Sequence, residues 1–193
     1  MKNFIFGYGS LINKESATKT LGRRIFDEEI LLCELNGYTR IWGVVNIVIV
    51  SNYMENKPVN AVFLDIRSQP GKSVNGVLME ITLDELERMD AREKNYIRID
   101  VTNNLNTTIN NRNSKVFTYV GKSKFLAVNY INPIVLKRYQ NLVNKGARYF
   151  GRKFVETFKA TTQSHNFKIV SGSYQFLDEQ QNILTGNSFG KTK

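Results

Sequence analysis

The feature that most limits the fold of this chain is a series of short apolar runs, each ended by glycine, asparagine or proline. In the first run Phe4, Phe6 and Tyr8 alternate with other residues, and the run breaks at Gly7 and Gly9. Such alternation is typical of strands with one buried face. The same pattern predicts further strands over residues 29–35, 40–50, 59–66 and 74–81, and a hairpin of strands 97–101 and 115–120 with an Asn-rich turn at 110–113.

Helix signals are fewer than strand signals. Thr82 and Glu85 form a capping box, in which each side chain accepts a hydrogen bond from the other residue's backbone N–H. This box predicts a helix over residues 83–93. The helix carries one apolar stripe, formed by Leu83, Leu86 and Met89.

Two more helices are predicted in the second half of the chain. Asn132 and Pro133 mark a helix start, because asparagine caps a helix well and proline fits its first position. An apolar helical spacing then continues to a stop at Gly146, and a shorter helix is predicted over 152–159. With no internal repeat and no linker rich in proline or serine, the pattern indicates one α+β domain.

Several classes of protein are excluded by what the chain contains. Its 193 residues hold one cysteine, Cys33, and one histidine, His165. A disulfide scaffold and a Cys/His zinc site therefore lack their ligands, and a His-dependent catalytic triad would need His165, which lies in a polar segment. No secretory signal and no apolar run of about 20 residues is present. We expect a soluble, cytoplasmic protein with no membrane association and no metal.

The net charge of +10 is concentrated in one segment. Residues 122–159 hold nine lysines and arginines against the single acidic residue Glu156, whereas the rest of the chain is almost balanced. Such a run is typical of a solvated helical face. The alternative is a surface for nucleic acid or another polyanion.

Three common catalytic or nucleotide-binding motifs are incomplete here. Gly7-Tyr8-Gly9 begins like a dinucleotide fingerprint, but Ile12 stands where the third glycine belongs. Two Gly-Lys-Ser tripeptides, at residues 71–73 and 121–123, lack the upstream glycine of a P-loop. Ser10 lacks the leading glycine of a nucleophile elbow. The sequence therefore predicts no nucleotide cofactor.

Two other motifs occur in an order that points to a family. A Tyr-Gly-Ser-Leu turn at residues 8–11 follows the first strand, and Met-Asp-Ala-Arg-Glu-Lys-Asn-Tyr occupies residues 89–96. Together with Gly-Val-Leu at 76–78 and a Tyr–x6–Gly-Ala element at 139–147, they make the sequence resemble the gamma-glutamylcyclotransferase-like family. The resemblance covers residues 3 to about 151. We assign residues 1–160 to this domain and 161–193 to a C-terminal extension with a hairpin around 178–182 and a loose tail.

The resemblance implies a fold, a reaction and a set of site residues. The fold is a small mixed β-barrel flanked by helices. The reaction is the cyclisation of a gamma-glutamyl group to 5-oxoproline with release of an amine or amino acid, without cofactor. Glu93 takes the role of general acid and base. The residues implied to bind substrate are Tyr8, Gly9, Ser10, Leu11, Tyr96, Tyr119 and Tyr139.

These residue types suit that chemistry. Burial of Glu93 would raise its pKa and bring its proton affinity nearer to neutral pH. Glycine lets the amides of residues 9–11 turn toward an oxyanion.

Structural roles remain open for the same residues. Glu93 can instead form a surface ion pair with Arg92 or Lys94, Gly9 can be only a tight turn, and the tyrosines can be core residues. We interpret Asp90 and Arg92 as surface or supporting residues. A non-catalytic binding protein with the same fold, using the basic segment 122–159, is the alternative function. The oligomeric state and the leaving group stay undetermined.

Overall fold

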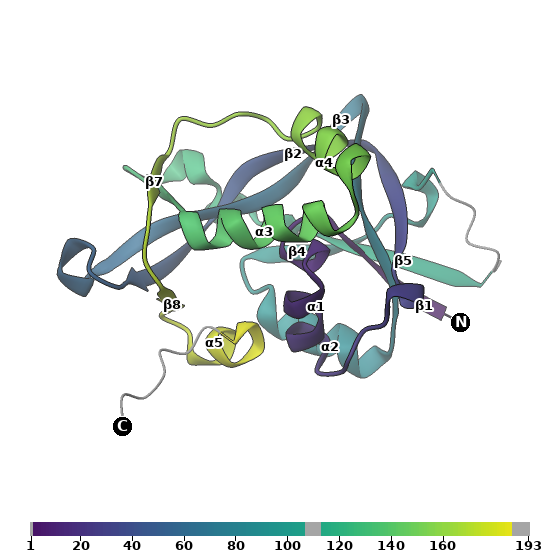
Figure 1. The fold of residues 1–193 in the computed structure, drawn as a ribbon, viewed down its shortest axis with the longest axis horizontal. Helices are drawn as coiled ribbons and strands as arrows, with labels where there is room; N and C mark the ends of the chain where they lie inside the picture. Colours follow the sequence, from purple (N-terminus) through teal and green to yellow (C-terminus); the bar gives the residue numbers. More distant parts are fainter. Residues whose placement is uncertain (1, 107–112, 187–193) are drawn as a thin grey trace.

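The computed structural model describes residues 2–106 and 113–186, and it contains one mixed sheet packed against helices (Figure 1). The main path of the sheet runs in the order β4–β5–β1–β3–β2–β8. The path is formed by β1 (Lys2–Gly7), β2 (Leu31–Val50), β3 (Pro58–Ile81), β4 (Tyr96–Asp100), β5 (Ser114–Gly121) and β8 (Tyr174–Phe176). β6 (Ile134–Leu136) pairs in parallel with β3 and with β7 (Lys168–Val170). The sheet curls into a half-barrel, which confirms the predicted α+β class.

Strands β2 and β3 are longer than predicted. Four strands were expected between residues 29 and 81, but the structure has two, β2 and β3. They pair antiparallel from Leu31 opposite Leu78 to Ile49 opposite Pro58. Gly37 and Gly71 lie in the gaps between the predicted strands, and the structure has irregularities within β2 and β3 there, where both glycines have positive φ. A bulge lets the chain absorb extra residues without ending the strand, so these turn signals bend the ribbon instead of reversing it.

The hairpin of residues 97–101 and 115–120 is confirmed as the antiparallel pair β4–β5. Its predicted turn at 110–113 falls mainly outside the described residues. β5 also pairs in parallel with β1, which places the second hairpin strand beside the strand that leads into the glycine turn.

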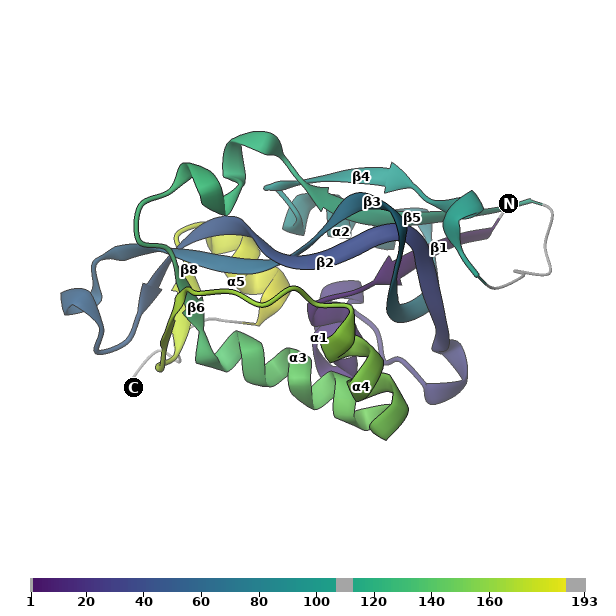
Figure 2. The same cartoon turned by 90° about the horizontal axis from the view of Figure 1, so that it is seen from above.

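Five helices accompany the sheet in the described ranges: α1 (Lys14–Leu21), α2 (Leu83–Arg92), α3 (Lys137–Tyr149), α4 (Arg152–Ala160) and α5 (Glu179–Thr185). Figure 2 shows α3 and α4 side by side along one face of the β2–β3 ribbon. Both helices bury apolar side chains against the sheet, including Tyr139, Val143, Phe154 and Phe158. Within the described ranges, no helix combines the length and the apolar character that crossing a membrane requires.

The capping box of α2 is confirmed. Thr82 Oγ1 accepts from Glu85 N–H at 3.2 Å, and Glu85 Oε2 accepts from Thr82 N–H at 2.8 Å. Of the predicted apolar stripe, Leu86 and Met89 are buried, but Leu83 in the first turn is 64% exposed.

The helix predicted from Asn132 was placed too early. Residues 134–136 form the buried strand β6, and the helix begins only at Lys137. The parallel ladder to β3 and β7 outweighs the local cap signal, and Asn132 itself adopts a positive φ. Gly146 was also wrongly taken as a stop, because α3 continues to Tyr149.

The hairpin predicted around residues 178–182 is wrong. Asp178 instead caps α5, accepting from Gln181 N–H at 3.0 Å. The described part of the C-terminal extension joins the main fold: β8 pairs with β2, and α5 packs against α1 and α2. The tail predicted to be loose, residues 187–193, lies outside the described residues.

Candidate functional site

The turn that follows β1 is the first part of the site. β1 ends at Gly7, and residues Ser10–Ile12 form one turn of 3-10 helix before Asn13 caps α1. Asn13 Oδ1 accepts from Ser16 N–H at 3.0 Å, which fixes where the turn ends. The first N–H groups of a helix have no partner within it, so the amides at the start of this turn can face a ligand.

Two glycines allow this turn to pack closely. A Cβ on Gly7 would lie 2.6 Å from Leu11 Cβ, and one on Gly9 would lie 3.2 Å from the Tyr139 hydroxyl oxygen. Gly9 therefore permits the tyrosine hydroxyl to approach the backbone of the turn.

Glu93 faces this turn from the end of α2. It is the C-terminal cap of the helix, with its N–H donating to Met89 O and its carbonyl accepting from Tyr96 N–H, both at 2.8 Å. Its side chain is 19% exposed. The capping box at the start of α2 and the turn at its end thus hold the Glu93 carboxyl in a partly buried position.

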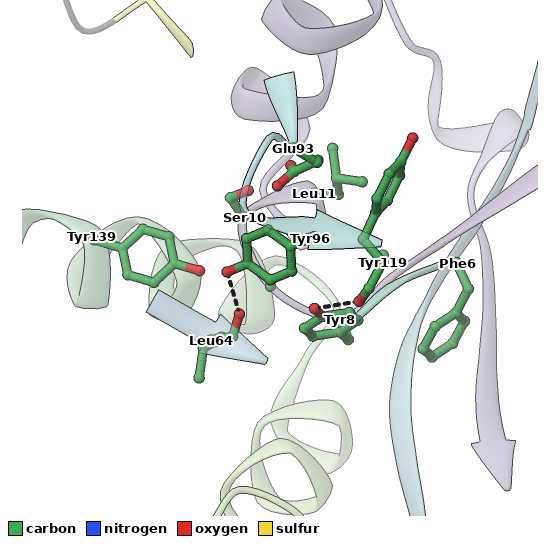
Figure 3. A pocket seen from close by; sticks show the side chains of 11 residues that line it. Phe6, Tyr8, Ser10, Leu11, Leu64, Glu93, Tyr96, Tyr119 and Tyr139 are labelled. Atoms are coloured by element: carbon green, nitrogen blue, oxygen red, sulfur yellow. Dashed lines mark hydrogen bonds between the residues drawn. The ribbon is translucent and has the colours of Figure 1, made fainter. Parts of the chain in front are cut away.

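These elements surround a small cavity of about 50 Å³ (Figure 3). In Figure 3 the Glu93 carboxyl points toward Ser10, the Tyr139 hydroxyl points into the cavity, and the Tyr96 hydroxyl points to the Leu64 carbonyl. All eight residues singled out from the sequence line this cavity. The complete lining is Phe6, Gly7, Tyr8, Gly9, Ser10, Leu11, Leu64, Glu93, Tyr96, Tyr119 and Tyr139.

Three of the tyrosine hydroxyls donate hydrogen bonds to protein acceptors. Tyr8 donates to the carbonyl of Tyr119 at 2.7 Å, and Tyr96 donates to the carbonyl of Leu64 at 2.9 Å. The Tyr119 hydroxyl donates to Asp90 Oδ1 at 2.7 Å. The hydrogen bonds of Tyr8, Tyr96 and Tyr119 therefore fix the positions of these three side chains in the cavity wall, and Asp90 fixes Tyr119.

The acid–base properties of the cavity follow from its burial. Burial raises the pKa of the Glu93 carboxyl above its ordinary value, and the neighbouring Arg92 guanidinium opposes this rise. Burial also raises the phenol pKa of Tyr8, Tyr96, Tyr119 and Tyr139. At neutral pH the hydroxyls stay protonated, while the carboxyl titrates closer to neutrality than an exposed glutamate.

Arg92 lies in the site, so of the two roles expected from the sequence, surface residue or supporting residue, the structure excludes the surface position. The residue is 8% exposed. Its Nη1 donates to Thr20 Oγ1 and its Nη2 donates to Ser10 Oγ, each at 2.8 Å, and Nη1 lies 3.5 Å from Glu93 Oε1. The helical spacing offered a signal for this burial, because Arg92 follows the buried Met89 by three positions.

A second cavity, of about 70 Å³, adjoins the first. The two share Ser10, Glu93, Tyr96 and Tyr139. The second extends between β8 and α5 and adds residues that sequence reasoning missed, among them Asn46, Phe63, Arg92, Phe176 and Gln181. Their positions depend on long-range pairing, which left no local motif.

Other reactive groups lie apart from these cavities. Burial raises the pKa of the Cys33 thiol to about 12, which disfavours the reactive thiolate. His165 packs against Trp42 and Phe167 and is not among the lining residues. In the described ranges, no group of three His, Cys, Asp or Glu residues is arranged to hold a metal ion.

Seven of the nine basic residues of segment 122–159 are exposed on α3 and α4. Part of its charge is paired: Lys145 lies 2.7 Å from Glu15, and Arg152 lies 2.7 Å from Glu156. These exposed pairs fit a solvated face, and they do not test whether a polyanion binds there.

Comparison with known proteins identifies the fold. Neither a family model nor a curated protein sequence matches the chain. Among solved structures, a gamma-glutamyl cyclotransferase matches with a TM-score of 0.52 and 16% identity, covering 96% of this chain and 99% of that one.

Two further solved structures agree with this match. An uncharacterized human protein has a TM-score of 0.53 at 16% identity, covering 95% of this chain and 98% of its own. A yeast gamma-glutamyl cyclotransferase specific to glutathione has a TM-score of 0.50 at 12% identity, covering 86% and 99%. At these identities the similarity establishes the gamma-glutamylcyclotransferase-like fold and leaves the activity to be argued from the site.

Proposed function

We propose that this protein cyclises a gamma-glutamyl group to 5-oxoproline and releases an amine or amino acid, with Glu93 as the general acid and base. One observation carries the proposal: the partly buried carboxyl of Glu93, whose pKa is raised, faces the glycine turn across a cavity. A carboxyl in this state suits proton transfer near neutral pH, and the turn offers donors for developing negative charge.

The reaction needs no nucleophile from the protein. The α-amine of the substrate attacks its own γ-carbonyl, so the new lactam C–N bond forms within one molecule and the amide C–N bond breaks. Because both reacting groups belong to the substrate, the protein's task is to hold the reactive conformer. The wall of tyrosines around residues 8–11 supports that task, since its hydroxyls are fixed by backbone and carboxylate partners.

Glu93 carries the protons in this scheme. Its carboxylate takes a proton from the α-ammonium, which frees the nucleophilic lone pair, and gives it to the nitrogen that is expelled; after the lactam bond forms, Glu93 carries the second proton from the α-nitrogen to the expelled nitrogen in the same way. Two protons leave the α-nitrogen and two arrive at the expelled nitrogen, so the amine departs as an ammonium ion. The balance closes without water, oxidant or cofactor.

The backbone amides of residues 9–11 are the donors we assign to the tetrahedral oxyanion. Side chains are absent at Gly7 and Gly9, where a Cβ would meet Leu11 or approach the Tyr139 hydroxyl, and this keeps the turn tight. Amides fixed in this way need no reorganisation as charge develops.

The test is the release of 5-oxoproline from glutathione, gamma-glutamyl dipeptides and gamma-glutamyl amines, followed by mass spectrometry. Wild type should turn over at least one of them, and Glu93→Gln should not. Glu87→Gln, an exposed position on the same helix, is the matched control and should keep full activity. Failure of a folded wild type to release 5-oxoproline from the whole panel overturns the proposal.

A further inference from the structure

We propose that the second cavity, between β8 and α5, receives the leaving group, and that it selects an amine bearing both a carboxylate and an apolar side chain. This inference rests on the proposed function, because it names the substrate class of the same site. Arg92 and the aromatic residues Phe63 and Phe176 are the residues that would set this preference.

The arrangement of the two cavities indicates which part of the substrate each one holds. The first is bounded by the turn of residues 7–11, whose amides suit the reacting carbonyl. Glu93, which must reach both the α-nitrogen and the expelled nitrogen, lines both cavities. The expelled group therefore extends from Glu93 into the second cavity.

One wall of the second cavity is aromatic. The rings of Phe63 and Phe176 stack with centroids 5.7 Å apart, and Tyr174 contacts both rings at 6.2 and 5.6 Å. This wall is assembled from β3 and the C-terminal strand β8. Fixed rings of this kind bind an apolar or aromatic side chain in preference to a small or polar one.

Arg92 contributes a positive charge to the lining of the same cavity. Its guanidinium donates hydrogen bonds to the neutral hydroxyls of Thr20 and Ser10, and Nη1 lies 3.5 Å from the Glu93 carboxylate. Whenever Glu93 holds the transferred proton, that carboxyl no longer balances the guanidinium. A carboxylate on the leaving group supplies the missing negative charge, and a guanidinium binds a carboxylate strongly.

The geometry also ties this wall to the catalytic end of α2. Gln181 on α5 donates from Nε2 to the carbonyl of Arg92 at 2.9 Å. Asp178, the cap of α5, forms an ion pair with Lys94. The C-terminal helix is thus fixed to the residues on both sides of Glu93, so the second cavity keeps its shape beside the reacting group.

The experiment compares three substrates that differ in one feature at a time. Gamma-glutamyl-phenylalanine has both features, gamma-glutamyl-phenethylamide lacks the carboxylate, and gamma-glutamylglycine lacks the ring. In wild type, kcat/KM for the first should exceed that for the second by roughly tenfold or more, the value of a charge-assisted hydrogen bond. In Arg92→Met this ratio should fall toward one, and Arg92→Lys should restore part of it.

Phe176→Leu tests the aromatic wall, with the half-exposed neighbour Leu177→Ala as its control. The leucine variant should lower the preference for gamma-glutamyl-phenylalanine over gamma-glutamylglycine by roughly two- to tenfold, and the control should not. Because each readout is a ratio of two substrates on one protein, a general loss of activity cancels. Ratios near one in wild type, or ratios that neither variant changes, overturn the inference.

A binding measurement separates this inference from the proposed function. Calorimetry with Glu93→Gln, which should not turn over its ligand, gives Kd for the same three compounds. Suppose that wild type releases no 5-oxoproline, but Glu93→Gln binds gamma-glutamyl-phenylalanine tenfold tighter than gamma-glutamyl-phenethylamide. If Arg92→Met in that background removes the difference, the cavity assignment stands without the reaction. Equal Kd values, or no binding, overturn it.

Discussion

Replacing Glu93 with glutamine should abolish turnover while leaving the fold intact or more stable. Glutamine keeps the shape of the side chain and removes its ability to carry a proton. General acid–base catalysis contributes about 10² to 10⁴ in rate, which is the loss we expect in kcat/KM. The opposite hypothesis, that Glu93 only pairs with Arg92, predicts full activity and a less stable protein.

The stability effect of the same substitution has a sign that the structure determines. Burial raises the pKa of Glu93 in the folded chain above its value in the unfolded chain. As pH rises from the unfolded pKa through the folded pKa, ionisation increasingly favours the unfolded chain, so this group lowers the free energy of unfolding. Glutamine does not ionise, and Glu93→Gln should therefore unfold at a higher temperature near neutral pH.

The assay is thermal unfolding of wild type, Glu93→Gln and Glu87→Gln from pH 4 to 8, beside 5-oxoproline release. The difference in Tm between wild type and Glu93→Gln should be smallest at pH 4 and grow as the pH rises. For a chain of this size each kcal/mol corresponds to about 2–4 °C. A lower Tm for Glu93→Gln at pH 7, with turnover preserved, would refute the reasoning.

Three further outcomes test other parts of the argument. Arg92→Met removes the cation that lowers the pKa of Glu93, so the acidic limb of the pH–kcat/KM profile should move to higher pH; an unmoved limb contradicts the pairing. Gly146→Ala should lower Tm and kcat/KM although alanine favours helices by about 1 kcal/mol, because the added Cβ would meet the backbone of residues 12–13 at 2.6–2.8 Å; an unchanged Tm in a melting curve would show that the helix can shift. Charge reversal at Arg148 and Arg152 should leave 5-oxoproline release unchanged. A polyanion-binding role would instead be supported if heparin retained the wild type, if this retention fell with rising salt, and if the variant were not retained.

The fold was predictable where local and long-range signals agree. The capping box at Thr82 predicted the start of α2 correctly, because the cap is satisfied within four residues. Two other local predictions failed: the helix start at Asn132, and the hairpin around residues 178–182, where Asp178 instead caps α5. The first segment is drawn into a parallel ladder with β3 and β7, and the second begins a helix that packs on α1 and α2. Neither contact leaves a trace within a short window of sequence.

The candidate site divides in the same way. The turn at residues 8–11 and the stretch ending in Tyr96 were visible because motifs mark them, and the structure brings both to one cavity. Phe176 and Gln181 were missed, since their place in the second cavity depends on β8 pairing with β2 and on α5 packing near Arg92. The motifs thus located the residues of the first cavity, and not the residues that line the second cavity alone.

The placement of Glu93 depends on contacts at both ends of α2. At the start, Arg23 binds the capping residue Glu85 at 2.6 Å, which fixes the helix to the segment before β2. At the end, Arg92 reaches Ser10 in the glycine turn, 82 residues earlier in the chain. Helix propensity does not set the position of α2 against the turn; these two arginines and the burial of Leu86 and Met89 in the core do. The position of Glu93 relative to the amides of residues 9–11 is therefore a tertiary property, which explains why a motif can name these residues but cannot position them.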